Sequence, residues 1–238
     1  MDEARRGVDQ GLASARSQDL LLQDSVLKIV AKRHAEARQS VHEALVRDPE
    51  DMRALRILVG SYAAQNQVGA AVEEVRAFAT QHPKSAKIQY FWGNLLLETG
   101  DRVQAKQALA AAKAADPDYT PTDLSLAQID LLGANWTDAR KQLTSILATK
   151  GEDALARKWL GMLEVSASDP AAAITDFRKV VESQPNDATA LNALAYLLAE
   201  NGNQPDEALK YAQKAKELDP KNAMIDDTLG WIDRKSVV

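Results

Sequence analysis

Histidines and paired carboxylates are the side chains of this chain that could perform metal or acid–base chemistry. The 238 residues contain His34, His42 and His82, and they contain no cysteine. His34 and His42 are eight residues apart and can share a helix face, but no third ligand stands at a suitable spacing. We therefore interpret all three histidines as surface or turn residues and expect no metal site.

The carboxylate pairs Glu73-Glu74 and Asp226-Asp227 are adjacent in the sequence. Neighbouring side chains on a helix point in different directions, so these pairs are poorly placed to cooperate as acid and base. The chain also lacks a glycine-rich phosphate loop, a G-x-S-x-G nucleophile motif and an HExxH zinc motif. The sequence therefore predicts no enzyme activity and no cofactor.

The bulk composition limits the classes of partner. A net charge of -5 disfavours nucleic acid, which attracts basic surfaces. No apolar run is long enough for a membrane span, and residues 1–17 carry charges without the apolar segment of a signal peptide. If Met1 is the true start, we expect a cytoplasmic protein. If the chain is a fragment of a longer protein, a periplasmic or envelope-associated location is expected instead.

Prolines recur at a regular spacing and indicate the elements that must position any functional residues. Pro49, Pro83 and Pro117 are 34 residues apart, Pro185 follows after twice that interval, and Pro220 comes 35 residues later. Because proline interrupts a helix interior, this period marks the boundaries of repeated units.

Other positions follow the same period when each proline is placed at position 32 of its unit. Position 20 is always small, which suits the crossing of two helices: Ala37, Ala71, Ala105, Ala139, Ala173 and, after a one-residue insertion, Ala208. Position 7 is mostly large and apolar, and position 8 is glycine three times, at Gly93, Gly161 and Gly230. A glycine inside a helix is unfavourable, so its return predicts close backbone approaches.

Turn residues separate the two apolar runs of several units. Gly100 and Asp101 form one such turn, and Gly202 and Asn203 form another. Glycine can close the first helix, and Asp or Asn can cap the second. Each unit is therefore predicted to be a helix, a turn and a helix. We expect Trp92, at position 7, and Trp136, at the turn, to be packing residues.

This pattern resembles the tetratricopeptide repeat, whose 34-residue units combine W-x2-L-G-x2-Y, A-x3-F and a late proline. Two stretches carry the resemblance: IQYFWGNLLLETGDRVQAKQALAAAKAADP, residues 88–117, and ALARKWLGMLEVSASDPAAAITDFRKVVESQP, residues 154–185. The resemblance implies an all-α fold, an α-solenoid in which helix-turn-helix units stack into a right-handed superhelix. The C-terminal repeats also resemble those of large bacterial proteins that accompany envelope export and exopolysaccharide systems.

The expected boundaries follow from this register. Residues 1–17 form a degenerate or frayed leader, 18–51 a partial repeat, 188–222 a repeat with one inserted residue, and 223–238 a truncated repeat start. Between them lie four full repeats: 52–85, 86–119, 120–153 and 154–187. The first helix of 18–51 fits poorly because Asp24 and Ser25 occupy positions 7 and 8. Asp233 stands where a large apolar residue belongs, so we expect the C-terminal end to lack a solvating helix and to be open to self-association.

The resemblance also implies a peptide-binding groove formed by positions 2, 5 and 9 of the first helices. The candidates carried over are Arg53, Arg56, Lys87, Tyr90, Asn94, Gln128, Lys158, Met162, Asn192 and Tyr196. This surface is basic at its N-terminal end, which suits an acidic or extended peptide partner. The family's clamp for chaperone tails is not expected, because Gly60 and Met162 replace required asparagines.

The resemblance therefore implies a noncatalytic scaffold that binds a peptide segment or assembles a complex. The alternative is a structural or regulatory segment of a larger exported bacterial protein, in which the array self-associates.

Overall fold

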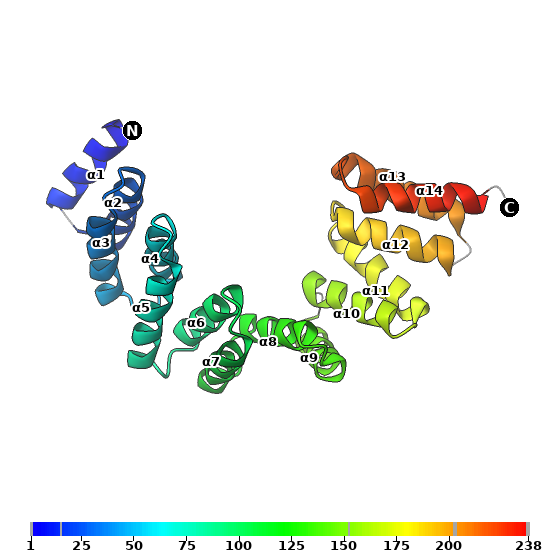
Figure 1. Cartoon of the computed structure of the whole chain (residues 1–238), viewed down its shortest axis with the longest axis horizontal. Helices are drawn as coiled ribbons and strands as arrows, with labels where there is room; N and C mark the ends of the chain where they lie inside the picture. Colours follow the sequence, from blue (N-terminus) through cyan, green and yellow to red (C-terminus); the bar gives the residue numbers. More distant parts are fainter. Residues whose placement is uncertain (1, 15, 152, 202–203, 237–238) are drawn as a thin grey trace. The chain divides into compact units, whose positions relative to one another are not determined.

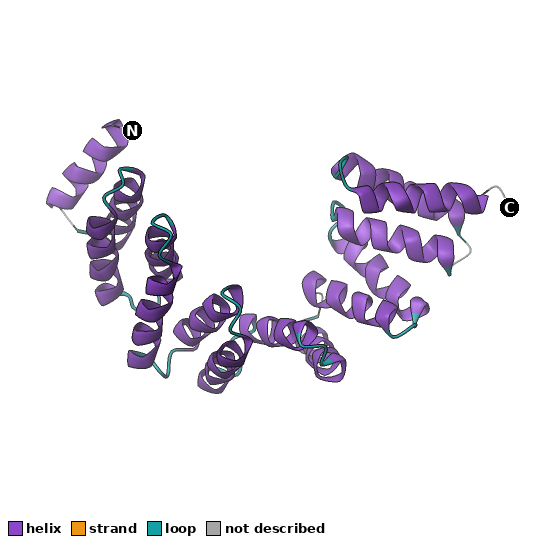
Figure 2. Ribbon diagram, viewed as in Figure 1, coloured by secondary structure: helices purple, strands orange, loops and turns teal. Residues whose placement is uncertain are grey.

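The computed structural model describes residues 2–14, 16–151, 153–201 and 204–236, and these residues form helices joined by short turns, without a strand (Figure 2). The chain divides into two compact parts, unit 1 (Met1–Ile129) and unit 2 (Asp130–Val238). The all-α helical-repeat fold expected from the sequence is confirmed. Among the described residues, no helix is both long and apolar enough to cross a membrane.

Unit 1 stacks its helices in chain order (Figure 1). It contains α1 (Asp2–Ser14), α2 (Gln18–Val30), α3 (His34–Arg47), α4 (Met52–Ala63), α5 (Val68–Gln81), α6 (Ala86–Glu98), α7 (Arg102–Ala115) and the start of α8 (Pro121–Leu132). Unit 2 contains the end of α8 and then α9 (Trp136–Lys150), α10 (Ala154–Ser166), α11 (Pro170–Ser183), α12 (Ala188–Glu200), α13 (Pro205–Leu218) and α14 (Ala223–Ser236). The even-numbered helices from α2 onward are the first helices of the repeats.

Helix ends follow from local chemistry. The prolines of the 34-residue period lie in turns between helices, and side chains such as Asp101, Asp153 and Asp187 cap the helices that begin beside them. Gly100 has a φ of 93° in the turn before α7, a conformation that glycine adopts without strain. The predicted turn at Gly202 and Asn203 lies outside the described residues.

The predicted helix crossings are buried. All six alanines at position 20 are fully buried between helices: Ala37, Ala71, Ala105, Ala139, Ala173 and Ala208. A Cβ added to Gly93 would lie 2.6 Å from Leu109 Cγ, and one added to Gly161 would lie 3.0 Å from Phe177 Cε2. Both glycines therefore permit close approach of the second helix, as the sequence predicts.

Gly230 and Trp136 correct two other expectations. A Cβ on Gly230 would meet only Arg234, at 3.9 Å, so no close approach requires this glycine. The side chain of Trp136 is not packed but 51% exposed, because this residue begins α9 beside the turn. Trp92 is buried in the core of unit 1, as expected.

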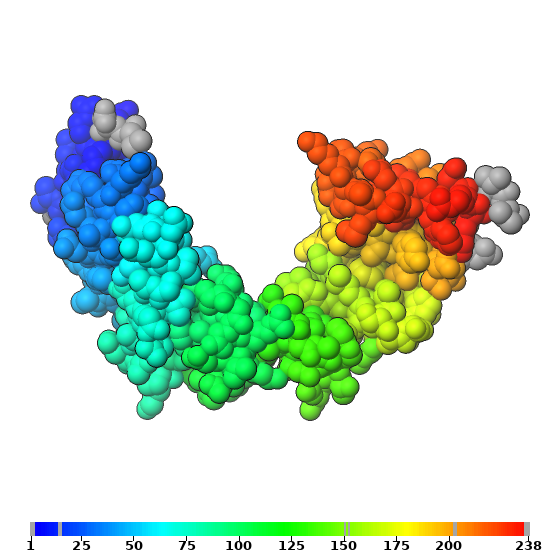
Figure 3. All heavy atoms as spheres, in the orientation of Figure 1, coloured from blue at the N-terminus to red at the C-terminus, as the bar shows by residue number. Residues whose placement is uncertain are grey.

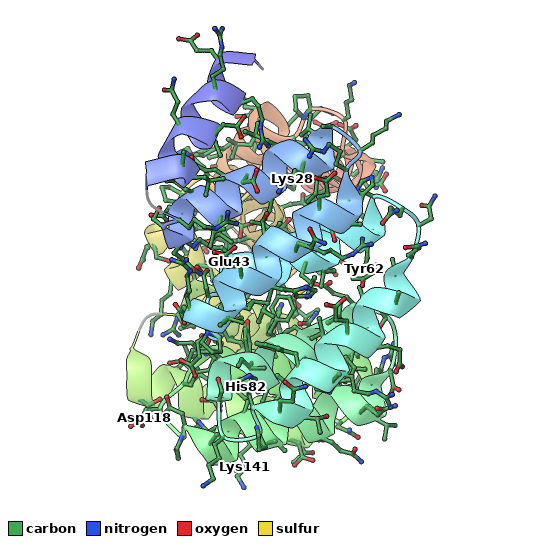
Figure 4. The ribbon with its side chains drawn as sticks, turned by 90° about the vertical axis from the view of Figure 1, so that its left-hand side faces the viewer. Lys28, Glu43, Tyr62, His82, Asp118 and Lys141 are labelled. Atoms are coloured by element: carbon green, nitrogen blue, oxygen red, sulfur yellow. The ribbon has the colours of Figure 1, made fainter. Side chains whose placement is uncertain are left out.

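The residues expected to form a degenerate or frayed leader include a helix. Residues 2–14 form α1, which buries Val8 and places Arg5 Nη1 2.8 Å from Asp24 Oδ1. Asp24 also accepts hydrogen bonds from Lys28 Nζ and Ser40 Oγ, both at 2.6 Å. The first helix of residues 18–51 therefore forms in spite of Asp24, because cations from α1 and α2 compensate its buried charge. Lys28 is labelled in Figure 4.

The C-terminal segment also differs from the expected open end. α14 packs against α12 and α13, and Figure 3 shows the side chains of α13 and α14, in orange and red, packed together within unit 2. Ile225 and Ile232 are fully buried. Asp233 is exposed, but Ile232 is buried at position 10, as Leu95 and Leu197 are in earlier units, and α14 covers the preceding helix pair.

Candidate peptide-binding grooves

Three of the predicted groove residues converge in unit 1. Arg56 of α4 and Tyr90 and Asn94 of α6 line a groove of about 340 Å³. Its other lining residues are mostly apolar: Met52, Val59, Phe91, Leu95 and Glu98. We refer to these eight residues as the Arg56 groove.

Hydrogen bonds fix the floor of the Arg56 groove. Asn94 Nδ2 donates to the carbonyl oxygen of Tyr90 over 2.9 Å, and Asn94 Oδ1 accepts from Ser125 Oγ of α8, also over 2.9 Å. The Tyr90 ring meets the Tyr119 ring edge to face, with centroids 5.4 Å apart. These contacts orient the aromatic wall before any ligand binds.

Arg56 is the cation of this groove that can pair with a ligand. Its side chain is exposed and has no ion-pair partner among the described residues. Burial and the nearby Tyr90 raise the pKa of Tyr119, whereas Arg56 acts in the opposite direction, so Tyr119 stays protonated near neutral pH. A guanidinium beside two phenols can donate several hydrogen bonds to a carboxylate.

The other two predicted cations of unit 1 form ion pairs within the chain. Arg53 lies 2.8 Å from Asp51 and 2.9 Å from Asp19, and Lys87 lies 3.3 Å from Glu50. Hydrogen bonds from Arg53 lower the pKa of Asp51 to about 2. These pairs reduce the positive charge that the first helices offer to a partner.

Arg53 also borders a second groove, of about 730 Å³, to which α1 contributes Ala4, Gly7 and Val8. Most of the remaining wall is apolar and comes from α2, including Leu22 and Val26. This groove does not follow from the expectation that residues 1–17 are a leader. The apolar positions of α1, Val8 and Leu12, were the available signal.

Asn192 and Tyr196 of α12 line a groove of about 720 Å³ in unit 2. α14 supplies most of its other wall, including Met224, Asp227 and Trp231. The full set, here called the Trp231 groove, is Asn192, Ala193, Tyr196, Met224, Asp226, Asp227, Thr228, Gly230, Trp231 and Arg234. The register already places Trp231 at position 9, as it does Tyr196. Positions 2 and 5 would have added Met224 and Asp227, but residues 223–238 were interpreted as truncated.

The remaining predicted residues lie outside these three grooves. Lys158 Nζ donates to Asp187 Oδ2 over 2.8 Å, which links α10 to the N-terminus of α12. The Met162 side chain is 51% exposed on α10, and Gln128 is half-buried on α8. The structure therefore brings together two subsets of the predicted residues, one in each unit.

The described residues contain no cluster of three or more His or acidic side chains that could hold a metal ion. His42 instead contacts Glu74 through its Nε2, and Tyr62, labelled in Figure 4, donates to the same carboxylate. The Glu74 contact raises the pKa of His42. This network connects α3, α4 and α5.

Comparison with known proteins supports the repeat fold. The tetratricopeptide repeat sequence pattern matches residues 29–86 and 160–223, about half of the chain. A TPR repeat-containing protein of Pseudomonas aeruginosa, PA4667, is 33% identical over 141 residues, which are 58% of this chain and 24% of the relative. The chain thus spans about a quarter of that relative.

Solved structures share the fold at low identity. P. aeruginosa PilF has a TM-score of 0.69 and 17% identity over 93% of this chain and 97% of its own. PilW, a type IV pilus biogenesis factor, has a TM-score of 0.67 and 20% identity over 89% and 98%. YrrB, a TPR protein with an unusual peptide-binding site, has a TM-score of 0.57 and 18% identity over 79% and 96%.

The repeat spacing, the helix-turn-helix units and these matches lead to one conclusion: the chain belongs to the tetratricopeptide repeat family.

Proposed function

We propose that this chain is a noncatalytic scaffold that binds an extended, acidic segment of a protein partner along the first helices of unit 1. Membership of the tetratricopeptide repeat family supports a protein-interaction role in general. The observation that carries the finer proposal is the convergence of Arg56, Tyr90 and Asn94 on one groove.

The contacts of the Arg56 groove favour a carboxylate beside an apolar side chain. Arg56 offers an unpaired guanidinium, and the phenols of Tyr90 and Tyr119 lie close to it. Met52, Val59 and Phe91 provide apolar surface at the same place. A partner segment gains a charge-assisted hydrogen bond and apolar contact together, which suits recognition of a short extended peptide.

The test is a selection from a random peptide display library on the wild-type chain and on Arg56→Glu. Peptides retained by the wild type are expected to be enriched in Asp or Glu next to an apolar residue, and Arg56→Glu should weaken their binding about tenfold. Lys84→Glu is the matched control, because Lys84 is exposed and lies outside the Arg56 groove. Equal loss in both variants, or no acidic enrichment, would contradict the proposal.

A second candidate is assembly of a bacterial envelope or polysaccharide-export complex, with a periplasmic or envelope-associated location and self-association of the array. The Pseudomonas relative supports one part of this candidate, a segment of a longer TPR protein, because the matched stretch is 24% of that relative. Fractionation of the source cells tests the location, and light scattering tests self-association. Recovery in the cytoplasm as a monomer at micromolar concentration would exclude this candidate.

A further inference from the structure

The Trp231 groove differs in chemistry from the Arg56 groove, although the same repeat positions build both. We propose that the Trp231 groove binds an Arg or Lys side chain of a partner segment. This inference deepens the proposed function, because it assigns a second ligand class to the first-helix surface.

Trp231 already attracts cations within the chain. Arg234 lies 5.5 Å and Lys235 5.3 Å from its ring centroid. The indole Nε1 donates to Glu200 Oε2 over 3.0 Å, which orients the ring against the end of α12. The indole face is the strongest cation–π acceptor among the aromatic side chains, so a ligand cation can contact it in place of Arg234, which is exposed and lines the same groove.

Unused acceptors line the same groove. Asp226 lies 2.5 Å from Lys216, whereas Asp227 has no ion-pair partner among the described residues. Asn192 Oδ1 is buried and has no hydrogen-bond partner in the part of the chain that the structure describes. Asp227 is exposed, so a ligand that donates N–H groups can pair with it, whereas Asn192 Oδ1 is reached only if its amide turns toward the groove.

Apolar surface completes the fit to a long basic side chain. Met224 is 65% exposed and Tyr196 is 44% exposed, and both line the groove. The methylene stem of Arg or Lys can lie on such surface while its charged end reaches a carboxylate. Arg234 is the one cation among the groove-lining residues, and Lys216 already pairs with Asp226. When a basic ligand takes the place of Arg234 at the ring, Asp227 is the acceptor for its charged end.

The experiment compares a random peptide display library selected on the wild type with one selected on Tyr196→Ala/Asp227→Asn. Both substituted residues lie on the groove surface, and circular dichroism checks that helix content is unchanged. Peptides retained by the wild type alone are expected to be enriched in Arg and Lys. If the wild type and the double variant retain peptides with the same Arg and Lys content, the inference is wrong.

One selected peptide then tests charge directly. Replacing its Arg by citrulline, which keeps the shape and removes the charge, should weaken binding by about five- to tenfold, and Asp227→Asn should remove that difference. Glu217→Gln is the matched control, because Glu217 is an exposed acid outside the groove, and it should leave the difference between the two peptides unchanged. Equal binding of the two peptides to the wild type would also overturn the inference.

The two proposals fail separately. If Arg56→Glu still abolishes binding of acidic peptides while no basic peptide depends on Asp227, this inference is wrong and the proposed function stands. If acidic peptides are independent of Arg56, the proposed function fails whatever the Trp231 groove binds.

Discussion

Units 1 and 2 place different chemistry at the same repeat positions. Position 7 is buried Asp24 in α2 and buried Leu194 in α12. Asp24 depends on Arg5, Lys28 and Ser40, whereas Leu194 packs among apolar residues. The repeat thus fixes the direction of a side chain but not its chemical type. A buried charge that departs from the pattern is tolerated where neighbouring side chains compensate it.

The largest effect is expected from breaking the buried network of unit 1. Burial acts to raise the pKa of Asp24, but the hydrogen bonds from Lys28 and Ser40 outweigh it and lower that pKa. Asp24→Ala leaves Lys28 and Arg5 without this partner and should reduce the free energy of unfolding by about 3–5 kcal/mol in urea titrations. Glu217→Ala, which removes an exposed carboxylate, should change it by less than about 0.5 kcal/mol.

The Asp24 network also makes the stability of unit 1 depend on pH. Because the folded pKa of Asp24 is lowered, its stabilisation is present above the unfolded value of about 3.9 and is lost as pH falls through the folded pKa. The acid transition of unit 1 should therefore become shallower in Asp24→Ala. An unchanged transition would show that the network contributes little.

Position 8 gives the next comparison, between Gly93 and Gly230. Gly93→Ala forces a Cβ against Leu109 and the carbonyl oxygen of Ala105, and should cost about 1–3 kcal/mol of unfolding free energy. Gly230→Ala enters open space and should gain up to about 1 kcal/mol from helix propensity. Thermal unfolding of both variants provides the measurement, and shifts of the same sign would refute the packing assigned to α6.

Two groove asparagines differ in hydrogen bonding. Asn94 bridges Tyr90 and Ser125, whereas Asn192 has an unsatisfied Oδ1. Asn94→Ala should therefore destabilise by about 1 kcal/mol, because each such bond contributes about 0.5–1.5 kcal/mol. Asn192→Ala should be close to neutral in the same urea titration. A larger loss at Asn192 would mean that its amide has a structural role.

The smallest effect concerns histidine, and all three histidines belong to unit 1. Glu74 raises the pKa of His42, so this stabilisation is complete below the unfolded pKa of about 6.5 and is lost as pH rises through the folded pKa. The side chain is about half exposed, so less than about 1 kcal/mol is expected. The unfolding free energies of the wild type and His42→Ala should converge at pH values above the folded pKa of His42. A constant difference between them at every pH would contradict this assignment.

The sequence was sufficient for the fold because repeat register depends on local chemistry: proline at boundaries, alanine at crossings and capping carboxylates. It could not predict the ordering of α1, because the Arg5–Asp24 contact joins residues from different helices. It placed Arg53 and Lys87 on the first-helix surface, but it could not show that acidic neighbours pair with them. Position 9 places Trp231 beside Tyr196 in the repeat register, but Met224 and Asp227 were not predicted because Asp233 suggested a truncated repeat, although Ile232 is buried at the ordinary position 10.

The most direct test of the binding account is amide NMR of the labelled chain during titration with an acidic peptide selected on the wild type. The account predicts shift changes in α4 and α6 around Arg56, Tyr90 and Asn94, absent in Arg56→Glu. Changes confined to the second helices α5 and α7, or unaffected by Arg56→Glu, would contradict it.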